Sequence, residues 1–533
     1  MLRFSPALFS TLLLGVTGLG AFSVQVPSVA AAAEPSPINF TFRLAGEPET
    51  LDWNRAHTPI ETYVLMNLME GLVAFDSRLQ VVPALAQSYT KSADGLIYTF
   101  KLRPGVKWQD GVALKAQDFV FSWKRLLSPL TAASYAYFLF DIVGAEDFNK
   151  GALTDFEKVG VQALDDSRLQ VKLRRPVAHW IQIPTFWVTF PLRRDVVEKH
   201  GDGWATPGRM LTLGPYTLAS YDLDSRIVLK ANPAYYGKSG NIAQATALIV
   251  KDESAAMNLY EVGKIDFLTD IGTVDLQRVS GRSDLKSFPY LKTAYLGFVV
   301  GKYPASNVAF RRAVAMSIDK TKIHQILFGG QQPAPSFVPP GLLGHSSKVG
   351  LPFDPVRAKA ELKRSGMDPA TVRAEIVVPN WDKARTLAQF LQQELKKHLG
   401  IRIEIQSFDH KTFRAQLDLR IFPMFLSSWS ADYPDADNFA SVFLSGAGNN
   451  RGGWASPKFD SQVLKARSLA IPKERERLYL EAQKLLLDED VVMVPLYYEP
   501  NLALVRPRVK GLELSPLNYL FLKNVTVETA VSE

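Results

Sequence analysis

The sequence predicts an α/β protein whose domains are built from discontinuous segments of the chain. Alternating apolar and polar residues, as at 38–44, are typical of half-buried strands. In the second half of the chain, strands and amphipathic helices take turns, which indicates a parallel sheet covered by helices. A length of 533 residues corresponds to about three domains, or to two large ones. No repeat or low-complexity linker marks a boundary, so we expect the chain to cross between domains more than once.

The first half contains strands separated by turn residues. The segments 38–44 and 96–102 alternate between apolar and polar residues, and Pro104 with Gly105 ends the second of them. Residues 119–127 predict a helix that ends before Pro129. Two further strands are predicted, at 169–173 and 226–230.

The second half is more regular. A strand at 374–378, a helix at 384–399 and a strand at 401–405 form a βαβ unit, which requires a parallel sheet. The helix ends at Gly400, the residue type that helices favour after their last turn. Further helices are predicted at 309–317, 320–328, 358–365 and 475–487, and a further strand at 491–498.

The N-terminal 33 residues predict a secretory signal peptide. Arg3 is followed by an apolar run at 7–22 and by four alanines at 30–33, which provide an Ala-x-Ala cleavage site. The alternative is a membrane anchor, but the run is short for a span of about 20 residues. The chain has no cysteine, which excludes disulfides, thiolate metal sites and a lipid-anchoring cysteine. We therefore expect an exported, soluble protein that is not a lipoprotein.

The charge pattern argues against nucleic acid as a partner. Lys and Arg number 61 against 53 Asp and Glu, which gives a formal net charge of +8. The basic residues are spread along the chain in short clusters, and no basic tail occurs, so a solvated surface is the better interpretation.

Catalytic and metal-binding motifs are missing from the sequence. The seven histidines show no ligand spacing, and no His-Glu-x-x-His stretch occurs. There is no Gly-x-Ser-x-Gly elbow and no phosphate-binding glycine loop. We therefore expect no metal, no cofactor and no enzymatic activity.

The segment 425–435 differs from the rest of the chain. A hydrophobic strand continues into small polar residues, then Trp429, Asp432 and a turn that contains Pro434. Such a strand end can present a backbone edge, an aromatic ring and a carboxylate together. It can equally be a core strand followed by a capped turn in which Asp432 is a turn former, and the residues alone leave both interpretations open.

A set of motifs along the mature chain resembles the extracytoplasmic peptide-binding proteins of bacterial ABC importers, the oligopeptide/dipeptide/nickel family. Each motif is loose by itself, but their order and spacing agree with the family throughout. The segments that carry the resemblance are 46–52, 69–72, 107–111, 118–123, 213–216, 229–236 and 310–320. WSADY at 429–433 is similar to the corresponding stretch of the oligopeptide and murein-peptide binders.

The resemblance implies a two-lobed periplasmic-binding-protein fold with an additional domain, whose discontinuous segments meet at a hinge. It implies a periplasmic, monomeric substrate-binding component that captures short peptides, including murein-type or modified ones, for a membrane-embedded ABC permease. The expected segments are 1–33 for the signal peptide; 34–80, 190–288 and 500–533 for lobe 1; 81–189 for the extra domain; and 289–499 for lobe 2.

The resemblance also implies roles for single residues. The carboxylate of Asp432 is expected to pair with the α-amino group of the peptide. Ser428 and Ser430 are expected to offer backbone groups, and Trp429 to line a side-chain pocket. The remaining candidates are Ala431, Tyr433 and, more weakly, Tyr135.

One departure from the family concerns the far end of the peptide. Leu426 occupies a position where oligopeptide binders often carry an Arg that meets the peptide carboxylate. This favours modified, longer or murein-type peptides. Other family ligands (a nickel chelate, haem, a glycoside or an opine), an exported hydrolase and a chaperone-like envelope protein remain as alternatives.

Overall fold

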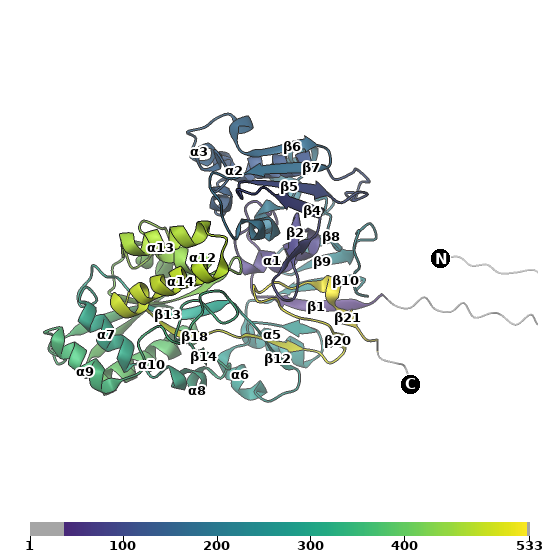
Figure 1. Cartoon of the computed structure of the whole chain (residues 1–533). Coiled ribbons are helices and arrows are strands. Elements are labelled where there is room, and N and C mark those ends of the chain that lie inside the picture. Colours follow the sequence, from purple (N-terminus) through teal and green to yellow (C-terminus); the bar gives the residue numbers. More distant parts are fainter. Residues whose placement is uncertain (1–36, 530–533) are drawn as a thin grey trace, which may run out of the picture. The chain divides into compact units, whose positions relative to one another are not determined.

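The computed structural model describes residues 37–529, which contain three main sheets (Figure 1). The described residues from Ile38 onward belong to one unit, and the predicted signal peptide lies outside them. The α/β prediction is confirmed. Among the described helices, none is both long and apolar enough to cross a bilayer.

The seven-stranded sheet combines strands from distant parts of the chain. Its order is β12-β19-β11-β1-β10-β9-β8, and β1 runs parallel to β10. Phe40 and Phe42 of β1 are fully buried at its centre. The strands are β1 (Asn39–Leu44), β8 (Tyr216–Asp222), β9 (Arg226–Ala231), β10 (Gln244–Ile249), β11 (Phe267–Leu268), β12 (Leu285–Phe288) and β19 (Asn501–Val505).

The six-stranded sheet contains the predicted βαβ unit. Its order is β14-β18-β13-β17-β15-β16, and β15 pairs with β16 in parallel, as the sequence predicts. The strands are β13 (Lys292–Phe298), β14 (Gln332–Pro333), β15 (Arg373–Pro379), β16 (Arg402–Phe408), β17 (Met424–Ser430) and β18 (Met493–Tyr498).

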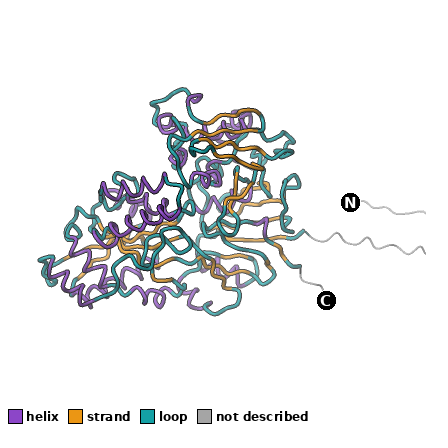
Figure 2. The backbone as a smooth tube through the Cα atoms, in the orientation of Figure 1, coloured by secondary structure: helices purple, strands orange, loops and turns teal. Residues whose placement is uncertain are grey.

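Helices cover both faces of this sheet, as Figures 1 and 2 show. Because neighbouring strand residues point to opposite faces, Met424 and Leu426 pack into one core cluster and Phe425 into another. The first cluster includes residues of α7 (Val308–Ser317), α9 (Pro355–Arg364) and α10 (Asp382–Leu399). The second includes residues of α11 (His410–Leu419), α12 (Ala436–Ala440), α13 (Pro457–Ser468) and α14 (Pro472–Lys484).

A third, four-stranded antiparallel sheet is formed within residues 86–172. Its order is β4-β5-β7-β6, and helix α2 packs against β6 and β7. The strands are β4 (Ala86–Lys91), β5 (Ile97–Leu102), β6 (Val161–Asp165) and β7 (Arg168–Lys172), and α2 spans Ala116–Leu127.

The remaining elements are short. They are α1 (Pro59–Leu68), α3 (Ala145–Asn149), α4 (Arg194–His200), α5 (Glu253–Glu261), α6 (Thr273–Val279) and α8 (Ile323–Leu327), with strands β2 (Val73–Phe75), β3 (Val81–Pro83), β20 (Val509–Lys510) and β21 (Thr526–Val527). The helix predicted at 320–328 is a 3-10 turn over Lys320–Lys322 followed by α8.

Two short segments connect the seven-stranded and six-stranded sheets. Residues 289–291 lead from β12 into β13, and residues 499–500 lead from β18 back into β19. The two segments run next to each other, because the backbone N–H of Glu499 donates at 3.0 Å to the carbonyl of Lys292, the residue that follows 289–291. We refer to this pair of connections as the hinge. The exact domain boundaries expected from the sequence stay a prediction.

Candidate ligand-binding site

Strand β17 carries an open backbone edge. It pairs with β13 along its whole length, but its pairing with β15 is confined to Met424 and Phe425. The N–H of Ala431 donates to the carbonyl of Leu291, on the β13 side, at 2.8 Å. Since successive residues of an antiparallel strand direct their backbone groups to alternate sides, Ser428 and Ser430 direct theirs away from β13. Both serines therefore face the side where β15 has ended.

Asp432 lies just beyond this edge. Its carboxylate receives two long hydrogen bonds of 3.5 Å, from the Tyr135 hydroxyl and from Nδ2 of Asn438. Asp432 lines a cavity, so part of the residue is accessible to water, but its carboxylate is surrounded by protein atoms. Burial raises the pKa of Asp432 to about 7, and the hydrogen bonds from Asn438 and Tyr135 offset this only in part. Within residues 37–529, no Lys, Arg or His forms an ion pair with Asp432.

The cavity beside Asp432 has a volume of about 340 Å³. Aromatic side chains form much of its wall, and they come from the segment 137–183 on one side and from the region between β17 and α13 on the other. The aromatic wall residues are Tyr137, Phe138, Trp429 and Tyr433. The structure thus places Trp429 on a cavity wall, while its contact with a ligand side chain stays a prediction.

Tyr433 is held in place by a buried ionic group. Its hydroxyl donates to Oδ2 of Asp437 at 3.0 Å, and Nε of Arg467 donates to Oδ1 of the same carboxylate at 2.9 Å. The His179 ring stacks on the Tyr433 ring at 4.7 Å, and its Nε2 lies 3.7 Å from Asp437. Burial alone would raise the pKa of Asp437, but Arg467 and His179 lower it to about 2. The turn that carries Asp432 is thus anchored by a charged network beneath it.

Tyrosines from distant segments face the Asp432 carboxylate. Burial and the charge of Asp432 raise the pKa values of Tyr135, Tyr137 and Tyr519. Tyr519 belongs to the C-terminal segment, and Tyr290 of the hinge contacts the Ser430 hydroxyl at 3.1 Å. Sequence reasoning named Tyr135 but missed Tyr137 and Tyr519, because their approach to Asp432 is created by the tertiary fold. It also missed Tyr290, which contacts Ser430.

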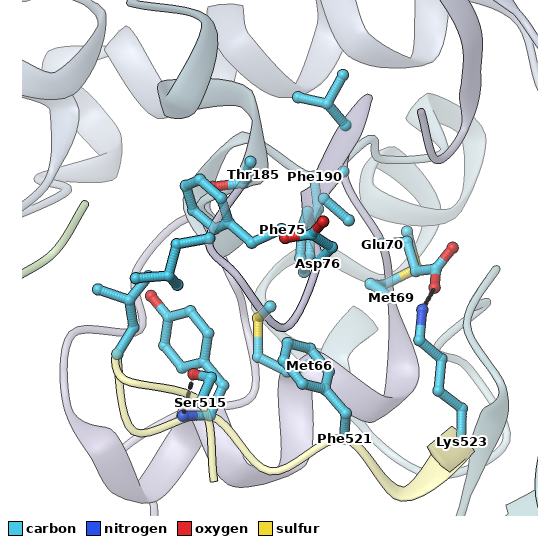
Figure 3. A pocket seen from close by; sticks show the side chains of 16 residues that line it. Met66, Met69, Glu70, Phe75, Asp76, Thr185, Phe190, Ser515, Phe521 and Lys523 are labelled. Atoms are coloured by element: carbon cyan, nitrogen blue, oxygen red, sulfur yellow. Dashed lines mark hydrogen bonds and ion pairs between the residues drawn. The ribbon is translucent and has the colours of Figure 1, made fainter. Parts of the chain in front are cut away.

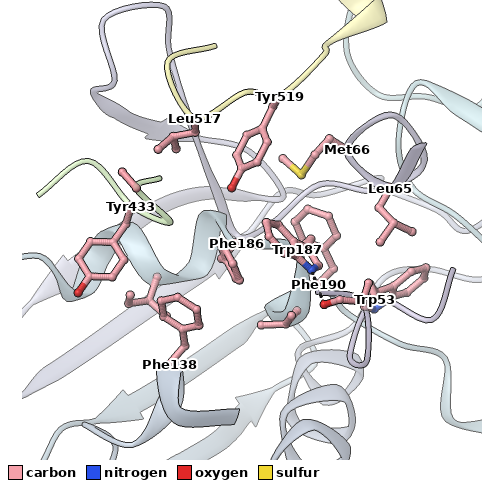
Figure 4. Close-up of a cluster of buried hydrophobic side chains, with 14 of the residues drawn as sticks. Trp53, Leu65, Met66, Phe138, Phe186, Trp187, Phe190, Tyr433, Leu517 and Tyr519 are labelled. Carbon is pink, nitrogen blue, oxygen red and sulfur yellow. Dashed lines mark hydrogen bonds between the residues drawn. The ribbon is translucent and has the colours of Figure 1, made fainter. Parts of the chain in front are cut away.

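The aromatic cluster next to the cavity joins parts of the chain that are distant in sequence, as Figure 4 shows. The Phe138 ring lies 6.0 Å from the Tyr433 ring and 4.5 Å from that of Phe186. Trp187 continues the cluster toward Tyr519, with a ring separation of 6.0 Å. In addition, the N–H of Ala178 donates to the carbonyl of Arg467 at 2.9 Å. The segments on both sides of the cavity are therefore in contact.

Leu426 occupies the position where oligopeptide binders often carry an Arg, but here its side chain belongs to the hydrophobic core. It is only 5% exposed and packs into the core cluster on the sheet face opposite Phe425. Its side chain is a core residue and belongs to the face away from Trp429, since residues three apart on a strand point to opposite faces.

Tyr519 also lines a second cavity, which Figure 3 shows. Its volume is about 40 Å³, enough for a few water molecules only. Met66, Phe521 and the Glu70–Lys523 ion pair, with a nitrogen–oxygen distance of 2.6 Å, form part of its wall. The small volume makes it unsuitable for a peptide. Over the part of the chain that the structure describes, no cluster of three or more His, Asp or Glu could hold a metal ion.

Two parts joined by a double connection, with a cavity between contacting segments, define a protein that encloses a small solute. The chain belongs to the bacterial extracellular solute-binding proteins, family 5, whose sequence profile matches residues 80–451. The resemblance predicted from the motifs is confirmed, and with it the two-lobed fold.

Similar proteins cover nearly the whole chain. A probable deoxycholate-binding periplasmic protein of Escherichia coli, YgiS, is 30% identical over 92% of this chain and 93% of its own. The periplasmic oligopeptide-binding protein OppA of Salmonella typhimurium is 30% identical over 90% of this chain and 91% of its own. Two solved structures, the E. coli murein tripeptide-binding protein MppA and Haemophilus influenzae OppA with the peptide RPPGFSPFR, are 27% and 26% identical. Both have a TM-score of 0.79, and they cover 92% and 93% of this chain and 99% and 100% of their own.

Proposed function

We propose that this protein is the periplasmic substrate-binding component of an ABC importer and that it captures short peptides. The observation that carries this proposal is the open edge of β17 at Ser428 and Ser430, which ends at the buried carboxylate of Asp432. Names of similar proteins, which include oligopeptide and murein-peptide binders, support the same class of ligand.

The chemistry of a peptide fits these two features. A peptide main chain has unpaired N–H and C=O groups, and burying each of them without a partner costs about 1–3 kcal/mol. Adding the peptide as a strand beside Ser428 and Ser430 pairs these groups irrespective of sequence. The α-ammonium group then meets Asp432, and exclusion of water strengthens the charge pair. Trp429 and Tyr433, which line the cavity, border the space for side chains, whereas Ala431, a further predicted contact, does not line it.

An anionic ligand fits the site less well. The name of YgiS indicates deoxycholate binding for that protein, and a bile anion placed beside Asp432 would bring two negative charges together. We propose that the guest is cationic at this end.

We further propose that the protein is not an enzyme, works as a monomer with a membrane-embedded permease, and divides into the lobes expected from the sequence.

The affinity for a free tripeptide is expected to rise as the pH increases from 5 to 7. Below the pKa of about 7 the Asp432 carboxyl holds a proton, which must leave before the ammonium group binds, at a cost of up to about tenfold per pH unit. Above about pH 8 the affinity falls, because the peptide α-amino group loses its own proton. Calorimetry across this range, with an N-acetylated peptide as the control, measures the profile. A flat profile for the free peptide would contradict both the proposed function and the role of Asp432.

Substituting Ser428 by Pro is expected to weaken peptide binding about fivefold, whereas Ser428→Ala leaves it unchanged. Proline removes the N–H that faces the open edge, and one hydrogen bond is worth about 1 kcal/mol. The fold tolerates proline there, since this N–H is outside the β13 ladder. Binding titrations of the two variants, with melting temperatures to check folding, test this. Equal affinities would show that the guest does not pair with this edge.

A further inference from the structure

The carboxylate of Asp432 is surrounded by few groups that can accept hydrogen bonds. Oδ1 of Asn438 already accepts from Nε1 of Trp429 at 2.8 Å and from the N–H of Asp432 at 3.1 Å. The Tyr433 hydroxyl donates to Asp437. The ammonium group of a guest has three N–H groups, and these contacts leave the Asp432 carboxylate as the principal acceptor among the side chains on this part of the wall.

Aromatic rings, by contrast, are abundant here. Tyr137, Phe138, Trp429 and Tyr433 share the cavity wall with Asp432. The Tyr137 ring stacks on Phe138 at 4.8 Å and 23°, while 46% of Tyr137 stays exposed. The charge of Asp432 acts on the Tyr137 phenol. Aromatic rings stabilise a cation through their negative faces, without any need for N–H groups.

The arginine on the cavity wall, Arg467, does not repel a positively charged guest. Arg467 is neutralised by its 2.9 Å contact with Asp437. A second carboxylate on the wall, Asp141, is paired with Arg175 at 2.9 Å. Asp432 is therefore the carboxylate of this wall that has no cationic partner among residues 37–529, and the cavity beside it measures about 340 Å³.

We propose that this end of the site recognises positive charge rather than N–H groups, and that it accepts N-methylated and quaternary ammonium ends as well as a free α-ammonium. The proposal rests on the proposed function for the placement of the guest's amino end beside Asp432. It extends the ligand class to N-methylated peptides and to other small molecules that carry a quaternary ammonium group.

The first test compares three forms of one tripeptide by calorimetry at pH 7.5: free, N-trimethylated and N-acetylated. The trimethylated form is expected to bind within about tenfold of the free form, because it keeps its charge and its contact with the rings. The acetylated form is expected to bind at least about a hundredfold more weakly. If the trimethylated form binds as weakly as the acetylated one, the inference is overturned and the proposed function stands. If the acetylated form binds as tightly as the free one, the proposed function itself fails.

The second test separates the Tyr137 ring from its hydroxyl group. Tyr137→Phe keeps the ring and is expected to bind the trimethylated peptide like the wild type, whereas Tyr137→Leu is expected to lose about three- to tenfold. Both variants change a residue that is half exposed, and melting temperatures check their folding. An equal loss in the two variants would mean that the hydroxyl group, not the ring, makes the contact, which would overturn the inference.

Discussion

The variant Asp432→Asn is expected to bind a free tripeptide about a hundredfold or more weakly than the wild-type protein. Asparagine has the same shape but no charge, so the guest's ammonium group is buried without its partner. Removing one partner of a buried ion pair costs about 3–5 kcal/mol, and 1.4 kcal/mol corresponds to a factor of ten. Calorimetry at pH 7.5, where most of Asp432 is ionised and most of the peptide α-amino group is protonated, gives the largest difference.

The control for this variant is a peptide without a charge at its amino end. The N-acetylated tripeptide is expected to bind the wild type weakly and Asp432→Asn no worse. A second control, Asp202→Asn, removes a charge from a side chain that is 82% exposed and should leave binding unchanged. If Asp432→Asn bound the free tripeptide as the wild type does, Asp432 could not be the partner of the amino group.

The variant Asp437→Asn is expected to lower the free energy of unfolding by about 3 kcal/mol. Asp437 is 1% exposed and accepts hydrogen bonds from Arg467, Tyr433 and Tyr479, the last at 3.3 Å. Asparagine would leave the Arg467 guanidinium largely buried without a counter-charge, which is the costly way to break such a pair. Denaturation in urea measures the loss, and Glu481→Gln, in an exposed pair with Arg477, should change little.

The same carboxylate predicts a pH dependence of stability. Its folded pKa of about 2 lies below the ordinary value of 3.8, so its contribution is fully present above about pH 4. It is lost as the pH falls toward 2, and amounts to about 2 kcal/mol at 1.36 kcal/mol per pKa unit. Asp437→Asn should therefore lose less stability than the wild type between pH 4 and pH 2. Parallel slopes for the two proteins over this range would contradict the assignment.

Local patterns predicted the fold better than they predicted the site. Strand alternation at 38–44 and the strand–helix–strand spacing at 374–405 are dictated by burial within a few residues, and the structure confirms both. The strand that ends at Ser430 is followed by the expected turn with Pro434, whereas helix α12 after it was not predicted. Which side of β17 stays open depends on where β15 ends its pairing. That is a property of two strands whose paired residues lie 48 positions apart, and the pattern of either strand alone does not contain it.

The contacts of Asp432 illustrate the same limit. Tyr135 lies 297 positions away in sequence and meets the carboxylate only because three parts of the chain converge. Asn438 is six residues downstream, a spacing with no motif attached to it. The resemblance to a known family supplied Tyr135 and Asp432, while Tyr137, Asn438 and Tyr519 could be found only by folding the chain.

The double connection between the sheets has a mechanical consequence. β13 is the direct continuation of residues 289–291, and it is bonded to β17 over its full length. Any rotation of the six-stranded sheet about this joint would carry the open edge of β17 and Asp432 with it as one piece. Two connections that are bonded to each other resist twisting between the sheets more than a single connection does. Closure of the two halves and the approach of the β17 edge to the proposed guest would then be one movement.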